Sequence, residues 1–367
     1  MSEFERCTLG DVANALSVLD YGDQDVWVKM GMAIKNEFGE DGFDTWAQWS
    51  SAYEKYKPSE ARSRWRSFKV SGARGTITIA TLFQAALERG WTKERKEYTD
   101  QEKREWAAEL GRRQQQREKD AAEEKAAIER GYTVIASAAK DIWGMLKQVG
   151  KAKYLGKKSI KPLGAAFVPH GIVIRYVTEK RKMFEEVVRI DVITGRDSIS
   201  DFYSNKSADE KFLYLKPGVL VVPVLNQSWS LVNLQIIYEG GAKKFMKGGR
   251  KSGCFFLIGD IDPNDFSTPI VEVEGYATGA SAHMATGWPV VVAWDAGNLA
   301  SIARFIRAAY PSHLILVAGD NDAGTDGNPG KVKAKEAADA IGGIDVIPNF
   351  DALAAGELDG SVEVVNG

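Results

Sequence analysis

The chain has 367 residues, 44% of them hydrophobic, and a formal net charge of −2 at pH 7. This apolar content suffices for two or three cores, and the balanced charge excludes a uniformly basic nucleic-acid-binding protein, so any nucleic-acid contact must be local. No apolar run reaches membrane length and no signal peptide is recognisable, so we expect a cytoplasmic protein with no membrane partner. Cys7 and Cys254 stand outside any Cys-x-x-Cys motif, which argues against a zinc site.

Residues 11–92 carry the pattern of a small helical bundle. Large aromatic residues recur there at helical spacings, and the segment ends at Gly90-Trp91. Aromatic side chains at such spacings are typical of a buried helical core. We therefore expect an all-α module at residues 1–92. Its core should include Trp27, Trp46, Trp49, Trp65, Phe68 and Phe83.

Residues 93–133 form a charged segment. Between Lys93 and Arg130 there are eleven basic and eleven acidic residues and almost no large apolar side chains. Thr99 and Glu102 have the spacing of a capping box, which marks a helix start. An exposed, salt-bridged helix and a flexible connector both fit this composition. The apolar pattern returns at residues 134–146, where we expect a packed helix to begin a domain that extends to residue 262.

The segment 243–251 places five cations in nine residues with no acid among them. Such a run can hold a nucleic-acid backbone or nucleotide phosphates, because backbone contacts are mainly electrostatic. A solvated hairpin surface is the alternative. The Gly248-Gly249 pair favours a tight turn that lets the backbone approach a ligand closely. The five cations are Lys243, Lys244, Lys247, Arg250 and Lys251.

Residues 263–367 alternate between strand and helix patterns. Short β-branched runs at residues 270–273, 289–294, 314–318 and 344–347 are typical of strands buried on both faces of a parallel sheet. Helix-length segments at residues 277–285, 298–309 and 331–341 separate or follow them. Right-handed crossovers then bring the carboxyl ends of the strands to one edge of the sheet, where open α/β sheets bind ligands.

Three acidic residues fall at that edge. Glu274 follows the first strand, and Asp320 and Asp322 follow the third. Oxygen ligands of this kind suit Mg²⁺, or Mn²⁺ in its place, and no His or Cys cluster offers a site for a softer metal. Asp320 and Asp322 could instead cap the Gly-rich loop at residues 323–330, as an isolated Asp-x-Asp often does. Glu274 and the strand order favour the metal site. Asp295 ends the second strand as a weaker candidate ligand or a helix cap.

These residues resemble the Toprim family. Val273-Glu274-Gly275-Tyr276, followed after some forty-five residues by Gly319-Asp320-Asn321-Asp322, is similar to the Toprim motif of bacterial-type primases, type IA and II topoisomerases and some nucleases. The segment 296–299 and the preceding segment 220–259 resemble primase-like proteins of phages and plasmids. Trp46, Trp49, Trp65 and Phe68 lie in a part of the chain that resembles a helical module found C-terminal to primase domains, the type 2 primase C-terminal family.

The resemblance implies a fold of three parts. These are an α/β Toprim domain with a Rossmann-like parallel sheet, a preceding α+β primase-core subdomain and an N-terminal all-α module. It also implies that Glu274, Asp320 and Asp322 hold the catalytic metals. The function expected is that of a DNA primase making short RNA primers. Its partners would be a single-stranded DNA template, ribonucleoside triphosphates and a replicative helicase. Phosphate contacts are expected from the basic run at 243–251 and from Lys331 and Lys335.

Two other functions fit the same residues. A Toprim nuclease would use the three acids to cleave DNA, although the primase-like segment 220–259 argues against it. A non-catalytic replication accessory protein would keep the fold without activity, and the missing zinc ribbon, a departure from many bacterial-type primases, leaves this alternative open. Nothing in the sequence supplies the large domain with a catalytic tyrosine that a topoisomerase needs.

Overall fold

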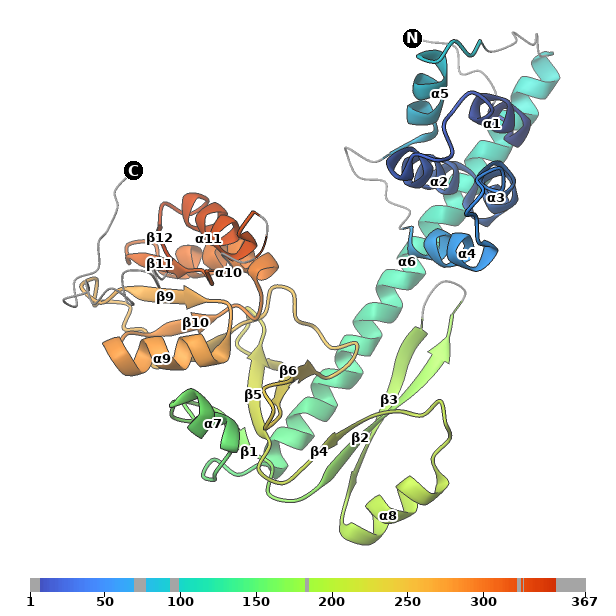
Figure 1. Cartoon of the computed structure of the whole chain (residues 1–367). Coiled ribbons are helices and arrows are strands. Elements are labelled where there is room, and N and C mark those ends of the chain that lie inside the picture. Colours follow the sequence, from blue (N-terminus) through green and yellow to red (C-terminus); the bar gives the residue numbers. More distant parts are fainter. Residues whose placement is uncertain are drawn as a thin grey trace. The chain divides into compact units, whose positions relative to one another are not determined.

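The computed structural model describes residues 7–68, 77–92, 99–181, 185–321, 325 and 327–347. The chain divides into two compact units, residues 1–117 and residues 118–367 (Figure 1). Each unit is described by itself. Within the described ranges, none of the helices combines the length and the apolarity needed to cross a lipid bilayer.

The first unit is a helical bundle. Asp11 and Thr8 form a reciprocal capping box at its first helix, and Asp23 caps the second by accepting from two backbone N–H groups. Its helices are α1 (Leu9–Leu16), α2 (Gln24–Phe38), the short 3₁₀ helix η1 (Gly39–Gly42), α3 (Phe43–Ser50), α4 (Pro58–Ser67) and α5 (Ile79–Leu87).

Aromatic rings form the core of this bundle, as the sequence predicted. Trp46 and Trp65 are fully buried, and their ring centroids lie 5.4 Å apart. Trp27 stacks on Trp46 at 4.6 Å, and Phe68 meets it edge-on at 5.6 Å. Helix α2 can approach these rings because Gly31 lacks a side chain: a Cβ there would lie 2.5 Å from the Phe68 ring.

Helix α6 (Asp100–Met145) contains residues 100–133 of the charged segment and the packed helix that follows them. The structure therefore favours the helical interpretation for the described residues of that segment. Thr99 and Glu102 bond reciprocally at its start, and Arg113 pairs with Glu109 at 3.0 Å. Its carboxyl-terminal part is apolar on one face, where Ile135 and Ile142 are fully buried in the second unit.

The second unit begins with two antiparallel sheets, in the strand orders β1-β5-β6-β7 and β3-β2-β4. Apolar residues of helix α6 and of both sheets form one buried cluster. The elements are α7 (Lys153–Lys158), β1 (Ala166–Phe167), β2 (Ile172–Lys180), β3 (Glu185–Thr194), α8 (Arg196–Asn205), β4 (Lys211–Leu215), β5 (Leu220–Leu225), β6 (Leu231–Ile237) and β7 (Lys243–Phe245).

A five-stranded sheet follows, in the order β12-β11-β9-β10-β8. Strands β9, β10, β11 and β12 run parallel, and β8 pairs antiparallel with β10. The elements are β8 (Phe256–Ile258), β9 (Ile270–Val273), α9 (Tyr276–Thr286), β10 (Val290–Val292), α10 (Ala296–Ala309), β11 (Ile315–Ala318), α11 (Pro329–Asp339) and β12 (Ile344–Val346).

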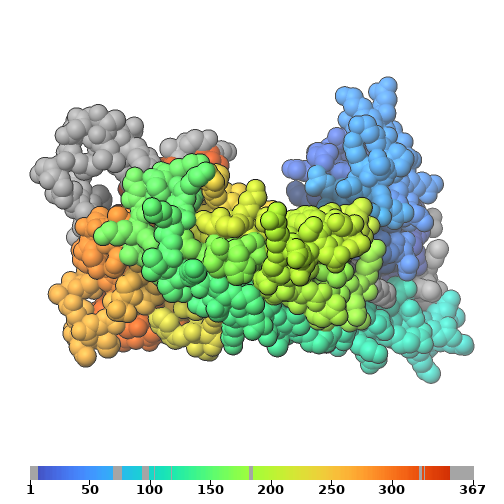
Figure 2. Space-filling model, turned by 90° about the horizontal axis from the view of Figure 1, so that it is seen from below, coloured from blue at the N-terminus to red at the C-terminus, as the bar shows by residue number. Residues whose placement is uncertain are grey.

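The parallel sheet and its helices agree with the sequence prediction, and their ends differ by no more than a few residues. The sequence did not reveal β8, which comes from the preceding segment. One apolar cluster joins both parts of the unit, since it includes Phe167 and Leu220 as well as Val273 and Tyr276. In Figure 2 the green and yellow surface of the first part meets the orange surface of the parallel sheet and its helices.

One carboxyl group lies inside the parallel sheet. Glu272, on the central strand β9, is 1% exposed, and neither of its carboxylate oxygens has a hydrogen-bond partner among the described residues. Burial raises the pKa of this carboxyl well above its usual value. The group is therefore neutral in the folded chain over a pH range in which an unfolded chain ionises it.

This difference in protonation predicts that the buried carboxyl lowers the stability of the fold by an amount that depends on pH. Glu272 has a lower pKa in the unfolded chain than in the folded chain. Between these two values the unfolded chain binds fewer protons than the folded chain. The free energy of unfolding therefore falls by about 1.4 kcal/mol for each unit by which the pH rises. We expect Glu272→Met to be more stable than the wild type at neutral pH, by a margin that shrinks as the pH falls toward the usual glutamate pKa. Urea unfolding at several pH values measures this margin. A constant margin would contradict a neutral buried carboxyl, and Glu272→Gln serves as the non-titrating control.

Candidate active site

Two carboxylates stand at the carboxyl ends of adjacent parallel strands. Val273 of β9 pairs in register with Ala318 of β11. Glu274 follows Val273 directly, and Asp320 follows Ala318 after the buried Gly319. Since neighbouring strands lie about 4.8 Å apart, the backbone brings these two acids to the same short stretch of the sheet edge. We call this stretch the acid edge.

The two acids differ in exposure. Asp320 is exposed, whereas Glu274 is partly buried and its Oε1 atom is shielded from solvent. Asp322 lies outside the described residues. Within the described part of the chain, no three His, Cys, Asp or Glu side chains form a group that could hold a metal ion. Two carboxylates nevertheless fit Mg²⁺, which keeps several waters and completes its coordination with substrate phosphates.

Asp295 lies at the end of the neighbouring strand, β10. Its side chain caps helix α10 by accepting from the Asn298 backbone N–H at 3.0 Å, and it also pairs with the ammonium of Lys251. Asp295 therefore has structural partners of its own within the protein. The residue before it, Trp294, has a left-handed backbone with a φ of 76°, which is rare for a bulky side chain.

The basic run reaches the acid edge through Lys243. Strand β7 carries this residue, whose ammonium lies so near the turn after Glu274 that a Cβ on Gly275 would be 3.6 Å from it. Lys251 lies beyond the end of the next strand, β10, where it pairs with Asp295. Phe245 of β7 supports this arrangement, because its ring meets Trp294 edge-on at 5.6 Å and lies 5.4 Å below the Lys251 ammonium.

Other cations of the run have partners within the protein. Arg250 donates to both carboxylate oxygens of Glu129 at 2.8 and 3.1 Å and lies 4.9 Å from the centre of the Tyr132 ring. Lys247 lies 3.6 Å from Glu185. Lys244 is exposed, 6.0 Å from the Tyr238 ring. Exposed ion pairs of this kind contribute little stability, so a phosphate can replace the carboxylates at small cost.

The two lysines predicted on the last helix are exposed. Lys331 lies in the first turn of α11, whose cap is the side chain of Asn328. Lys335 lies one turn further and is 3.5 Å from Asp339. The first turn of a helix favours anions, so Lys331 is better placed than Lys335 for a phosphate contact.

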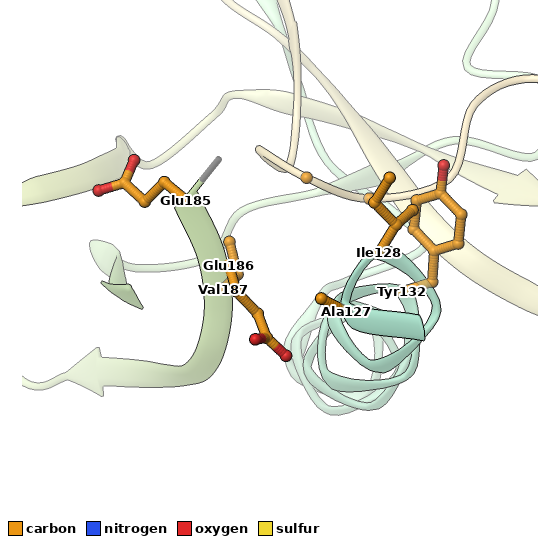
Figure 3. Close-up of a pocket in the computed structure, with 9 residues that line it drawn as sticks. Ala127, Ile128, Tyr132, Glu185, Glu186 and Val187 are labelled. Carbon is orange, nitrogen blue, oxygen red and sulfur yellow. The ribbon is translucent and has the colours of Figure 1, made fainter. Parts of the chain in front are cut away.

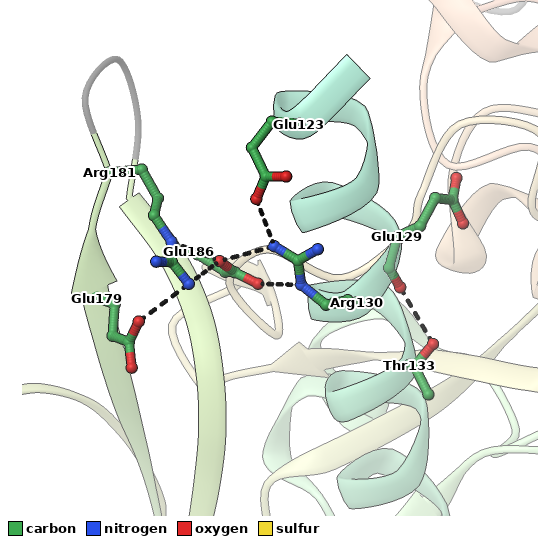
Figure 4. Close-up of polar contacts among 7 residues, drawn as sticks. All are labelled: Glu123, Glu129, Arg130, Thr133, Glu179, Arg181 and Glu186. Atoms are coloured by element: carbon green, nitrogen blue, oxygen red, sulfur yellow. Dashed lines mark hydrogen bonds and ion pairs between the residues drawn. The ribbon is translucent and has the colours of Figure 1, made fainter. Parts of the chain in front are cut away.

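An ion-pair network that the sequence did not reveal ties α6 to strand β3. Glu186 is 5% exposed and accepts hydrogen bonds from Arg130 at 2.8 and 3.2 Å and from Arg181 at 2.8 Å (Figure 4). The Arg130 hydrogen bonds and, after them, those of Arg181 lower the pKa of the Glu186 carboxyl. Arg130 also donates to Glu123, which lies 7 residues earlier in α6. Arg130 and Glu186 are 56 positions apart in sequence, beyond the range of any local pattern.

A cavity of about 260 Å³ lies beside this network. Its lining includes Ala127, Ile128 and Tyr132 of α6, and Figure 3 shows Ala127 on the side of the helix toward β3, with Ile128 and Tyr132 further round the helix. The acids of β3 at its wall are already engaged: Glu185 accepts from Lys211, which lowers the pKa of its carboxyl to about 2, and Glu186 binds the two arginines. What remains is largely apolar, so this cavity does not suit a phosphate.

Two parts of the chain match known families. Residues 270–348 match the Toprim domain family, and residues 11–86 match the family described as Primase C terminal 2 (PriCT-2). The chain thus carries a Toprim domain and a PriCT-2 module. Both resemblances drawn from the sequence are confirmed.

The curated relatives are two proteins named DNA primase TraC, from Escherichia coli. One is 37% identical over 153 residues, which are 38% of this chain and 14% of the relative. The other is 38% identical over 133 residues, which are 35% of this chain and 9% of the relative. The matched region therefore spans only a small part of these relatives.

Solved primase structures show a more distant similarity. The DnaG primase catalytic domain bound to ssDNA is 12% identical, with a TM-score of 0.36, over 64% of this chain and 79% of that one. The primase fragment of the bacteriophage T7 primase-helicase protein is 15% identical, with a TM-score of 0.28, over 38% of this chain and 59% of that one.

Proposed function

We propose that this chain is a DNA primase that makes short RNA primers on single-stranded DNA for the replication of a phage or another mobile element. The observation that carries the proposal is that Glu274 and Asp320 lie together at one edge of a Toprim sheet, with Lys243 beside Glu274 and Lys251 paired with Asp295 after the neighbouring strand. The sequence similarity to the TraC primases supports the reaction, and replication places it in the cytoplasm.

The acidic and the basic residues of the site would have different roles in the reaction. Glu274 and Asp320, with Asp322 from outside the described residues, would hold Mg²⁺ or Mn²⁺. When bound, such ions neutralise charge on the attacking and leaving oxygens of a phosphoryl transfer. Lys243 and Lys251 would orient the phosphates of an incoming ribonucleoside triphosphate or of the template. Lys244, Lys247, Arg250, Lys331 and Lys335 would extend the phosphate-binding surface around them.

The proposed division of the chain follows from the same function. Residues 1–92 would be the PriCT-2 module, residues 93–133 a charged helical linker, residues 134–262 the primase-core subdomain and residues 263–367 the Toprim domain. A replicative helicase is the natural further partner, since a primer is needed where the duplex is opened. Pull-down of this chain with the helicase of the same replicon tests that partner.

A primer-synthesis assay tests the reaction directly. The protein is incubated with single-stranded DNA, labelled ribonucleotides and Mg²⁺, and a parallel reaction contains labelled DNA and no ribonucleotides. Short labelled RNA products support a primase. Cleavage of the DNA in the parallel reaction would indicate a Toprim nuclease, and neither product would indicate an accessory protein.

The basic run offers a separate prediction. We expect Lys243→Ala with Lys251→Ala to weaken binding of single-stranded DNA and to reduce the salt slope of binding by about one unit per lost phosphate contact. Fluorescence anisotropy at several salt concentrations measures this slope. Lys206→Ala with Lys216→Ala removes the same charge outside the basic run and serves as the control. Equal slopes for the wild type and the Lys243/Lys251 variant would assign the run to a solvated surface.

A further inference from the structure

A buried amide side chain joins the backbone just after the basic run to the end of strand β10. Asn298, in the first turn of α10, is 4% exposed. Its Nδ2 donates to the backbone carbonyls of Cys254 at 2.9 Å and Ala293 at 2.8 Å, and its Oδ1 accepts from the Gly253 N–H at 2.8 Å. Both amide protons and the carbonyl are thus used to connect residues 253–254 with the end of strand β10.

A second buried amide holds the other end of the same loop. Asn233 of β6 is fully buried, and its Oδ1 accepts from the Met246 N–H at 3.2 Å while its Nδ2 donates to the Arg250 carbonyl at 3.2 Å. The loop backbone lies against this side chain, because a Cβ on Gly249 would be 2.3 Å from Asn233 Nδ2. The loop is therefore fixed on one side to the antiparallel sheet.

Residues 246–254, which we call the clamped loop, carry three of the candidate cations. Lys247 lies beside Glu185, Arg250 lies beside Glu129, and Lys251 pairs with Asp295. Asp295 also accepts from the Asn298 backbone N–H, so one helix start supplies both the partner of Lys251 and the amide that holds the loop. An amide that is buried and fully bonded resists rearrangement, since losing any one bond leaves a buried polar group unsatisfied.

We propose that Asn298 and Asn233 are positioning residues that hold Lys251 against Asp295, next to the acid edge, an inference that rests on the proposed function for its role in catalysis. Neither amide is expected to touch the substrate. Asn298 acts through the clamped loop, and its loss would let Lys251 move away from Asp295 while the Toprim sheet stays folded. The segment 296–299, noted in the sequence without a role, then has one.

The test measures the reactivity of Lys251 in the full chain. A lysine-acylating reagent is added in limited amount, and peptide mass spectrometry gives the labelling rate of Lys251, with Lys153 as an internal reference. We expect Asn298→Ala to raise the Lys251 rate about two- to fivefold, the change that losing an exposed ion pair allows. Asp295→Asn, which removes the partner itself, sets the upper limit. Asn298→Asp keeps the acceptor for Gly253 and loses both donors, so it provides a second variant if the alanine variant does not fold.

The control is another buried polar residue of the same domain. His313 is 4% exposed and bonds the Asp262 carbonyl at 3.0 Å, at the amino end of the sheet. His313→Ala is expected to lower the Tm and to leave the labelling of Lys251 unchanged. The proposal is overturned if folded Asn298 variants label Lys251 at the wild-type rate, or if Lys153 accelerates to the same extent.

Primer synthesis adds an independent measurement. If Asn298 acts through Lys251, then Asn298→Ala should lower the rate in the wild-type background and cause little further loss in a Lys251→Ala background. Equal losses in both backgrounds would overturn the connection to Lys251. A wild-type chain that makes no primers would contradict the proposed function and leave the labelling result to decide the positioning role.

Discussion

Glu274→Gln and Asp320→Asn are each expected to lower primer synthesis by a factor on the order of a hundred or more, because each removes a charge that would hold a metal supplying several kcal/mol of transition-state stabilisation. The amide replacements keep the shape of the side chain. Folding should be preserved, and relief of repulsion between carboxylates is expected to stabilise the metal-free protein slightly. Asp322→Asn is expected to behave in the same way. Primer yield over a Mg²⁺ titration and thermal unfolding of each variant measure the two effects.

The matched control is Glu336→Gln. Glu336 is an exposed carboxylate two turns into α11 that pairs with Lys333 at 2.6 Å. Its loss changes the net charge of the same domain by the same amount without touching the acid edge, so primer synthesis should stay near the wild-type level. Wild-type activity in the Asp320→Asn and Glu274→Gln variants would contradict the metal site and favour an accessory role.

Gly319→Ala should damage the site through packing alone. Gly319 is buried between β11 and Asp320, and its N–H donates to the Val346 carbonyl at 3.1 Å. A Cβ there would lie 2.6 Å from the Ala334 Cβ and 2.8 Å from the Gly330 carbonyl oxygen. The first turn of α11 must then shift, which costs about 1–3 kcal/mol of stability. Since Asp320 is the next residue, we expect primer synthesis to fall at least tenfold, a loss of about 1.4 kcal/mol in transition-state stabilisation.

Gly156→Ala is the control for this variant. Gly156 lies in α7 with nothing within 4 Å of an added Cβ. Alanine there is expected to stabilise the chain by about 0.4–1 kcal/mol, because it reduces the freedom of the unfolded state. A Gly319→Ala protein with wild-type Tm and activity would show that the loop after β11 adapts without moving Asp320.

Local patterns predicted much of this molecule. The β-branched runs indicated β9, β10, β11 and β12, and because parallel strands end on one edge, they also indicated that Glu274 and Asp320 lie together. The tryptophan spacing indicated the helical core of the first unit. These features depend on neighbours within a few residues or on a general rule of chain handedness, so a single sequence contains them.

The ion-pair partners of the charged residues could not be predicted from local sequence patterns. Nothing near Arg250 in the sequence points to Glu129, and nothing near Lys251 points to Asp295, because these pairs depend on how separate elements pack. From the sequence alone, all five cations of the basic run were therefore expected to be available for phosphate, although three of them lie beside acids of the protein. Asn298 was visible as part of a motif, but its three bonds arise only when the 253–254 backbone reaches α10.

The strand order of the Toprim sheet bears on how the protein loses structure. Strand β9 is central, with paired neighbours on both sides and all four of its residues buried, whereas β8 and β12 are the two outer strands. Backbone amides on such a strand exchange with solvent chiefly through the largest openings of a domain. Glu274 is attached directly to that strand. The backbone that carries this carboxylate is therefore protected against the small, frequent openings that loosen the outer strands of the sheet, and it is exposed chiefly by the larger openings of the domain.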